Sequence, residues 1–212
     1  MRILVTTGPT REPIDPVRFI TNASSGRMGV AVAGQAAGAG HAVTLLAGPG
    51  VDLRDLPAGV ERVDFVSVAD LKTALHERFP ACDALVMAAA VGDFQVANRL
   101  ARKIPRSGGP ISLRLVPTED LLASLAPLKR PDQVVIAFAV EDGPADAIQA
   151  KARREMKAKS ADYVVVNRPE AMSASESDAC ILGPRETILP WAVRPKDTLA
   201  AEIVRTLERV KK

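Results

Sequence analysis

Aromatic residues are scarce in this sequence, at 3% of its 212 positions, while apolar residues make up 47%. The core must therefore be built from aliphatic side chains, mainly valine, leucine, isoleucine and alanine. Charge of one sign is not in large excess, and the net charge of +3 suits an anionic small-molecule ligand. Because no basic run is interleaved with aromatic residues, the sequence gives no support for nucleic-acid binding. We expect a globular protein whose ligands are small molecules.

Cysteine and long apolar runs are also lacking. Cys82 and Cys180 stand far apart and outside the spacings of metal or redox motifs, so we interpret both as reduced thiols of an intracellular protein. No apolar run reaches the ~18 residues that a membrane span requires. The first residues, MRILVTT, are typical of a β-strand and too short for the apolar region of a signal peptide. We expect a cytoplasmic protein with no membrane partner.

Motifs of several common enzyme classes are absent. No G-x-G-x-x-G follows the first predicted strand, and the second strand ends in Ala47-Gly48-Pro49 without the acidic residue that would hold a ribose. These absences disfavour NAD. The sequence contains no P-loop, HExxH or GxSxG motif, and His41 and His76 have no partner at metal-ligand spacing. We interpret both histidines as structural or exposed.

Strand-like and helix-like segments alternate along the chain. Their apolar patterns predict strands at residues 2–7, 42–47, 62–66, 84–91, 111–116, 133–140, 162–166, 179–182 and 187–189. Helices are predicted at residues 25–39, 68–79, 145–160 and from about 195 onward, with a further one opened by Thr118 as N-cap. This alternation predicts an α/β fold: a single Rossmann-like, doubly wound, mostly parallel sheet with helices on both faces and a small flap at about 95–109. We expect a single domain that spans residues 1–212.

Ligands of such sheets bind at the carboxyl ends of the strands. Residues 7–29, 89–94, 117–120 and 138–141 follow four predicted strands. We therefore expect these segments to surround one crevice.

The loop after the first strand is unusually long. It reads TTGPTREPIDPVRFITNASSGRMG from Thr6 to Gly29, whereas about two to six residues suffice for such a connection. The loop ends in Ser24-Ser25-Gly26 at a helix start, where unpaired backbone N–H groups and the cation of Arg27 favour an anion. A plain serine N-cap is the structural alternative.

This loop closely resembles the opening of phosphopantothenoylcysteine synthetase, also called phosphopantothenate–cysteine ligase. The family pattern is T-A/S-G-x-T-x-E-x-I-D-P-V-R-x-I-x-N-x-S-S-G-K/R-M-G. Resemblance continues in AAAVGDF at 88–94, FAVE at 138–141 and DYVVVN at 162–167, and it covers the whole chain. The flavin-dependent decarboxylase domain often fused ahead of the synthetase has no trace here, so we expect a stand-alone synthetase domain.

The resemblance implies a two-step reaction in coenzyme A biosynthesis. CTP, or ATP in eukaryotic members, activates the carboxylate of 4′-phosphopantothenate as an acyl-nucleotidyl anhydride, and the amine of L-cysteine then attacks it. Mg²⁺ and cationic groups offset the charges that meet at the α-phosphate. The resemblance also implies a homodimer, in which the flap reaches across to the partner.

The resemblance also assigns roles to individual residues. Asn22 matches the catalytic asparagine, whose amide can offer N–H donors to a developing oxyanion without titrating; an Asx turn is its structural alternative. Lys103 matches a flap lysine that shares in catalysis and contacts the nucleotide phosphates, and Asp93 would bind the nucleotide or its Mg²⁺. The phosphate- and substrate-binding residues are Ser24, Ser25, Gly26, Arg27 and Gly29. The nucleotide-binding residues are Ala88, Ala89, Ala90, Asp93, Lys103, Glu119, Asp120, Leu121, Leu122, Phe138 and Lys159.

The sequence departs from the family pattern in the nucleotide half. Pro105 and Arg106 stand in place of two flap lysines, and a proline removes both a charge and a backbone donor. Glu119 is an additional acid at a helix start, and Glu155 replaces a nucleotide-facing lysine. Glu155 can alternatively belong to a row of surface ion pairs.

Three hypotheses follow. The first is the ligase itself. The second is a diverged paralogue, either a non-catalytic phosphate- or nucleotide-binding module or a ligase for a related acid. The third is a nicotinamide oxidoreductase of similar fold, against which the missing glycine fingerprint argues.

Overall fold

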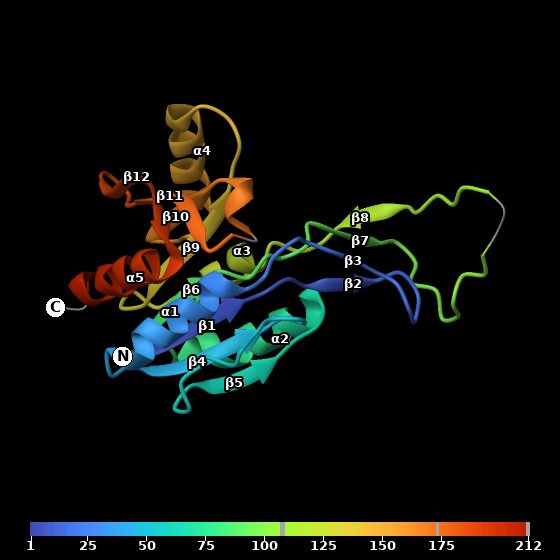
Figure 1. Cartoon of the computed structure of the whole chain (residues 1–212), viewed down its shortest axis with the longest axis horizontal. Helices are drawn as coiled ribbons and strands as arrows, with labels where there is room; N and C mark the ends of the chain where they lie inside the picture. The colour runs from blue at the N-terminus through green and yellow to red at the C-terminus, as the bar shows by residue number, and fades with distance from the viewer. Residues whose placement is uncertain (107–108, 173, 211–212) are drawn as a thin grey trace.

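The computed structural model describes residues 1–106, 109–172 and 174–210. Its centre is an eight-stranded sheet in the order β12-β11-β10-β9-β6-β1-β4-β5 (Figure 1). Neighbouring strands are parallel except that β11 is antiparallel to both β10 and β12. The predicted mostly parallel α/β sheet is confirmed. The strands are β1 (Arg2–Thr7), β4 (Ala42–Ala47), β5 (Glu61–Asp64), β6 (Ala84–Met87), β9 (Val134–Val140), β10 (Tyr163–Asn167), β11 (Glu176–Leu182) and β12 (Thr187–Pro195).

Helices cover both faces of the sheet. α1 (Arg27–Gly38) and α5 (Lys196–Val210) pack side by side on one face, as Figure 1 shows. The apolar residues of α2 (Val68–Arg78), α3 (Leu121–Leu125) and α4 (Ala145–Ala158) form a second core with the opposite face. The short 3₁₀ turns are η1 (Phe79–Ala81), η2 (Ala126–Leu128) and η3 (Pro169–Met172). Both cores are predominantly aliphatic, as the composition predicts.

The direction in which the chain adds strands reverses beside β1. From β1 the chain continues to β4 and β5 on one side, then returns to β6, β9 and β10 on the other. The loops that follow β1 and β6 both lie at this point, and backbone hydrogen bonds join Ala90 of the second loop to Gly8 and Thr10 of the first. Doubly wound sheets bind their ligands at such a switch point.

Several predicted boundaries are wrong for local reasons. The buried strand expected at 84–91 ends at Met87, where the chain turns out over the sheet edge. Thr118 is not an N-cap, because its hydroxyl donates to the carbonyl of Gly92 at 2.5 Å. Asp120 caps α3 instead by accepting a hydrogen bond from the amide of Ala123 at 3.0 Å. β12 is longer than expected because it pairs along β11 to Pro195.

Two hairpins extend from the sheet and form a projection that we call the arm (Figure 1). β2 (Arg11–Pro13) pairs with β3 (Phe19–Thr21), and β7 (Phe94–Val96) pairs with β8 (Leu115–Pro117). The strand expected at 111–116 is thus mostly wrong, because the three residues of β7 offer partners only to residues 115–117. The first hairpin was not predicted, since three prolines obscured its strands. Residues 107 and 108 of the expected flap lie outside the described residues.

Asp15 ties the two hairpins together. Its carboxylate accepts hydrogen bonds from the amides of Val17 and Arg18 in the first hairpin and from the amide of Ile104 in the second, at 2.8, 2.9 and 3.1 Å. The guanidinium of Arg18 lies 2.6 Å from the same carboxylate. Desolvation alone raises the pKa of Asp15, but these donors outweigh it and lower the pKa to about 2.

Replacing Asp15 with asparagine is expected to loosen the arm. The new amide would turn an NH₂ group toward the donors on Ile104 or Arg18, so at least one hydrogen bond is lost. Amide hydrogen exchange in the segment from 94 to 106 should accelerate. Because the pKa of Asp15 is lowered, the stability that its carboxylate contributes is fully present above the ordinary carboxyl pKa of ~3.9. This stability is lost as the pH falls through about 2.

Asp52→Asn is the matched control. The pKa of Asp52 is also lowered to about 2, but by the side chain of Arg54, within one exposed loop. Faster exchange in the arm of both variants would show that Asp15 has no special role there.

Among the described residues, no helix is both long enough and apolar enough to cross a membrane. Cys82 and Cys180 are buried free thiols, as expected. Burial raises the pKa of each thiol to about 11, so neither is reactive at neutral pH.

Candidate functional site

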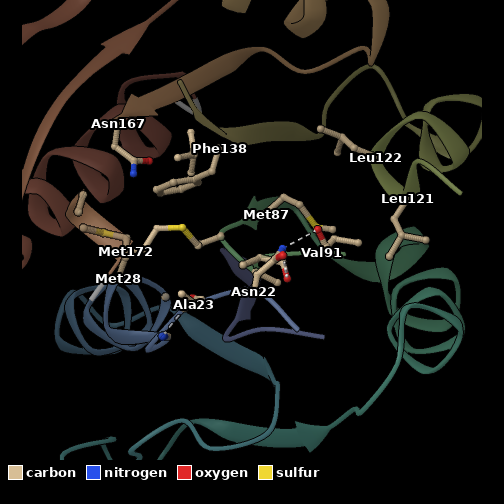
Figure 2. Close-up of a pocket in the computed structure, with 18 of the residues that line it drawn as sticks. Asn22, Ala23, Met28, Met87, Val91, Leu121, Leu122, Phe138, Asn167 and Met172 are labelled. Atoms are coloured by element: carbon tan, nitrogen blue, oxygen red, sulfur yellow. Dashed lines mark hydrogen bonds between the residues drawn. The ribbon is translucent and has the colours of Figure 1, made fainter. Parts of the chain in front are cut away.

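A cavity of about 550 Å³ opens at the switch point. Its walls come from the four segments expected to converge there, together with residues between the end of β10 and the first turn of α5. Figure 2 shows Phe138 and Asn167 on one wall, Leu121 and Leu122 on another, and Asn22 facing them across the opening. The size is typical of a small-molecule site.

The start of α1 forms one end of the cavity. Gly26 is the N-cap, with φ of 74°, and no side chain caps the helix, so the serine N-cap alternative is wrong. The amides of the first turn are therefore available to a ligand. Ser25 instead donates from its hydroxyl to the carbonyl of Met172 at 3.1 Å, which ties the turn to η3. The positive φ of Gly26 explains why glycine stands at this position.

Gly29 brings α1 against β1. A Cβ atom at this position would lie 2.4 Å from Cβ and 2.5 Å from Oγ1 of Thr7. The hydroxyl of Thr7 in turn donates to the carbonyl of Gly26 at 2.5 Å. Glycine is therefore required for the helix to begin this close to the end of the strand.

Asn22 is held by the loop after β6. Its amide nitrogen donates to the carbonyls of Ala90 and Val91 at 3.3 and 3.0 Å (Figure 2). Among the described residues, none donates a hydrogen bond to its amide oxygen. The expectation that Asn22 offers its N–H groups to an oxyanion is therefore wrong for this conformation. The group that it can present to a ligand is an acceptor.

The acidic side of the cavity is partly neutralised. Glu119 is 2.6 Å from Lys72 on α2, and Asp120 is 3.1 Å from Lys159 after α4. These pairs are half-exposed, so each is weak, but they reduce the repulsion that Glu119 would exert on an anionic ligand. The carboxylate of Asp93 has no ion pair with a described residue.

No group of three or more potential metal ligands occurs among the described residues. The residues present suit Mg²⁺ because this ion commonly takes only one or two carboxylates, with ligand phosphates and water completing its shell. Asp93 is the free carboxylate on the cavity wall that fits this requirement.

Most of the predicted site residues lie together. Ser25 and Lys103 are the two that do not line the cavity, Ser25 because it bonds to η3 and Lys103 because it is exposed on the arm. Glu155 is also outside the lining, 3.8 Å from Lys151, so the surface ion-pair interpretation is favoured. The lining residues not proposed from the sequence include Asn167, Met172, Ser177 and Lys196.

The fold and the cavity define a doubly wound α/β protein with a candidate ligand site at the switch point of its sheet. Comparison with known proteins agrees with the fold. The family model for the DNA/pantothenate metabolism flavoprotein C-terminal domain matches residues 1–210. The chain belongs to this family, that of phosphopantothenoylcysteine synthetase.

Two named relatives are similar to most of this chain. The coenzyme A biosynthesis bifunctional protein CoaBC of Mycobacterium tuberculosis is 42% identical over 185 residues, which are 84% of this chain and 44% of that protein. A prokaryotic protein named cysteine/cysteine sulfinic acid decarboxylase is 39% identical over 210 residues, 97% of this chain and 57% of its own. The chain thus spans about half the length of these relatives. A crystal structure of a CoaBC C-terminal domain superposes with a TM-score of 0.81 at 31% identity, covering 98% of this chain and 94% of that one.

Proposed function

We propose that this chain, as a single domain spanning 1–212, is a ligase that joins 4′-phosphopantothenate to L-cysteine in coenzyme A biosynthesis. A nucleoside triphosphate, CTP or ATP, would activate the carboxylate as an acyl-nucleotidyl anhydride. The observation that carries the proposal is the convergence of the motif segments on one cavity: Asn22 and the first turn of α1 stand opposite Phe138 and Leu122. The enzyme would act in the cytoplasm, where Cys82 and Cys180 stay reduced.

The cavity walls supply what the two steps require. A carboxylate and a triphosphate repel each other, so the amides at the start of α1 and the cations of Arg27 and Lys159 lower the cost of bringing them together. The apolar wall of Leu121, Leu122 and Phe138 limits the access of water to the anhydride.

Asn22 would act in the second step. Its amide oxygen can accept a hydrogen bond from the incoming amine of cysteine and so orient the nitrogen lone pair toward the acyl carbon. The bonds from its nitrogen to Ala90 and Val91 fix the amide plane for this task.

Asp93 would hold Mg²⁺ together with phosphate oxygens of the nucleotide. When bound, the ion would neutralise charge on the triphosphate and polarise the α-phosphate.

The test is release of pyrophosphate in the presence of 4′-phosphopantothenate, cysteine, Mg²⁺ and either CTP or ATP. Release that depends on both acid and nucleotide, with formation of the cysteine conjugate, is the expected result. Binding of 4′-phosphopantothenate without release from either nucleotide would contradict the ligase and favour a binding module. Release with a different acid would identify a related ligase.

The arm supports a homodimer as the active form. It carries exposed apolar side chains, and Lys103 lies on it rather than in the cavity of its own chain. A second copy would cover these side chains and bring Lys103 to the partner's nucleotide. The exposed apolar residues of the arm are Val17, Phe19, Phe94, Leu100, Ile111, Leu113 and Leu115.

Replacing Ile111 and Leu113 with aspartate is expected to convert the dimer into monomers, because charge would be buried at the interface. Light scattering reports the mass of the particle and so distinguishes dimer from monomer. If Lys103 acts across the interface, the rate of ligation should fall when the dimer is lost. Val193→Asp on β12 is the control, since Val193 is more exposed than Ile111 and Leu113 but lies far from the arm. Persistence of the dimer in the double variant, or dissociation in the control, would contradict the proposal that the arm forms the dimer interface.

A further inference from the structure

Lys196 is a buried cation without a counterion. It is the first residue of α5 and is only 7% exposed. Its ammonium group donates to the carbonyl of Ala171 at 2.7 Å, and no carboxylate of a described residue lies within ion-pair distance of it. The neighbouring Asp197 is exposed and does not pair with it. Buried charges in proteins are normally paired, so an unpaired one needs an explanation.

The surroundings of Lys196 disfavour its charge. Burial lowers its pKa, and the positive charge of Arg27 lowers it further. The N-terminus of a helix carries a partial positive charge, and Lys196 stands at this end of α5. A single hydrogen bond to the carbonyl of Ala171 does not account for the free energy needed to bury a positive charge at this position.

Lys196 lies at the same end of the cavity as the first turn of α1. Both Lys196 and Arg27 line this cavity. Ser25 donates to the carbonyl of Met172 while Lys196 donates to that of the preceding residue, Ala171. Consecutive carbonyls of η3 therefore hold the two groups next to each other.

Ser177 is a second buried polar side chain on the wall of this cavity. It lines the cavity from β11 and is 3% exposed. No hydrogen bond joins its hydroxyl to any described residue. An available hydroxyl beside an unpaired ammonium is a donor set for an anion with several oxygens.

We propose that Lys196 and Ser177, together with Arg27 and the amides of the first turn of α1, form a subsite for a phosphoryl group. The bound phosphoryl group is the counterion that the folded chain does not supply to Lys196. This inference deepens the proposed function, since both 4′-phosphopantothenate and the nucleotide carry such a group. It also adds the cations of Arg27 and Lys196 to a cavity whose lining includes the carboxylates of Glu119 and Asp120.

The first test compares thermal unfolding of the wild type and Lys196→Met, without and with inorganic pyrophosphate. Removing an unpaired buried charge should leave the free protein as stable as the wild type or more stable. Pyrophosphate should raise the melting temperature of the wild type and have little effect on the variant. Loss of one charged hydrogen bond should weaken pyrophosphate binding by about 10- to 100-fold.

Two further variants complete the test. Lys157→Met removes an exposed cation of α4 and should behave as the wild type does. Ser177→Ala removes a hydroxyl that no hydrogen bond joins to a described residue, so it should keep the stability of the free protein and weaken pyrophosphate binding. A purely structural Lys196 predicts the reverse: a lower melting temperature for free Lys196→Met, and unchanged pyrophosphate affinity in Lys196→Met and Ser177→Ala. That result, or no stabilisation of the wild type by pyrophosphate, would overturn the subsite.

Titration calorimetry with 4′-phosphopantothenate and with CTP identifies the source of the phosphoryl group as the ligand whose affinity falls in Lys196→Met. The outcome is separable from that of the ligase proposal. If the wild type turns over and Lys196→Met binds 4′-phosphopantothenate and CTP with unchanged affinity, the phosphoryl subsite is rejected while the ligase proposal stands. Absence of turnover with pyrophosphate binding that depends on Lys196 would reject the ligase and keep the subsite.

Discussion

Replacing Asn22 with aspartate is expected to slow ligation by about 10²- to 10³-fold, the usual cost of removing one well-placed polar group from an active site. In the wild type the amide nitrogen donates to Ala90 and Val91. A carboxylate has only acceptors, so it would face these carbonyls without a hydrogen bond and turn away from them. Both the fixed orientation and the neutral acceptor offered to the amine of cysteine are lost.

Single-turnover kinetics separate the two steps affected by Asn22→Asp. The burst of pyrophosphate, which reports activation, should fall less than formation of the cysteine conjugate. Gln35→Glu, the same change of amide to carboxylate on the exposed side of α1, is the control and should leave both steps unchanged. If Asn22→Asp forms the conjugate at the wild-type rate, Asn22 has no role in the attack.

The second large effect is expected at Gly29. An alanine there would place its Cβ 2.4 Å from that of Thr7 and 2.8 Å from the carbonyl oxygen of Thr6, so the helix must move away from β1. Overpacking of this kind costs about 1–3 kcal/mol, and the contact with backbone places Gly29→Ala at the upper end of that range. The movement would also disturb the bond from Thr7 to Gly26 and with it the amides that face the ligand. Chemical denaturation measures the stability, and pyrophosphate affinity measures the damage to the turn.

Gly34→Ala on the same helix is the matched control for Gly29→Ala. A Cβ atom at Gly34 would have no neighbour within 4 Å. Alanine should therefore stabilise the helix by about 0.5–1 kcal/mol through its better intrinsic propensity. Equal effects of the two substitutions would show that close approach to β1 is not what requires glycine at position 29.

The architecture could be predicted from the sequence because its signals are local. Apolar runs alternating with amphipathic stripes predict a doubly wound sheet. Of the stripe predicted on the last helix, Leu199, Ile203 and Leu207 are buried on α5, whereas Val210 at its end is 46% exposed. The same logic placed four loops at one crevice, because the carboxyl ends of parallel strands share an edge. Alternation failed at residues 111–116, where the length of the partner strand decides the pairing.

The details of the site depend on contacts between distant segments. The direction in which the amide of Asn22 points is set by carbonyls 68 and 69 positions away in the sequence. Lys196 and Ser177 reach the cavity from the C-terminal third of the chain, and no local pattern in the sequence pointed to either of them. Ion pairing of Glu119 with Lys72, 47 positions earlier, was equally hidden.

Trp191 is the single tryptophan of the sequence, and it lies on β12 with the guanidinium of Arg168 5.3 Å from its ring centre. Arg168 directly follows Asn167, which forms part of the cavity wall. All indole fluorescence of the protein therefore originates beside Arg168, the residue that follows this wall. Since Arg168 follows this wall in sequence and lies over the ring, we expect the fluorescence of Trp191 to change when a ligand occupies the wall, which would report binding without a label.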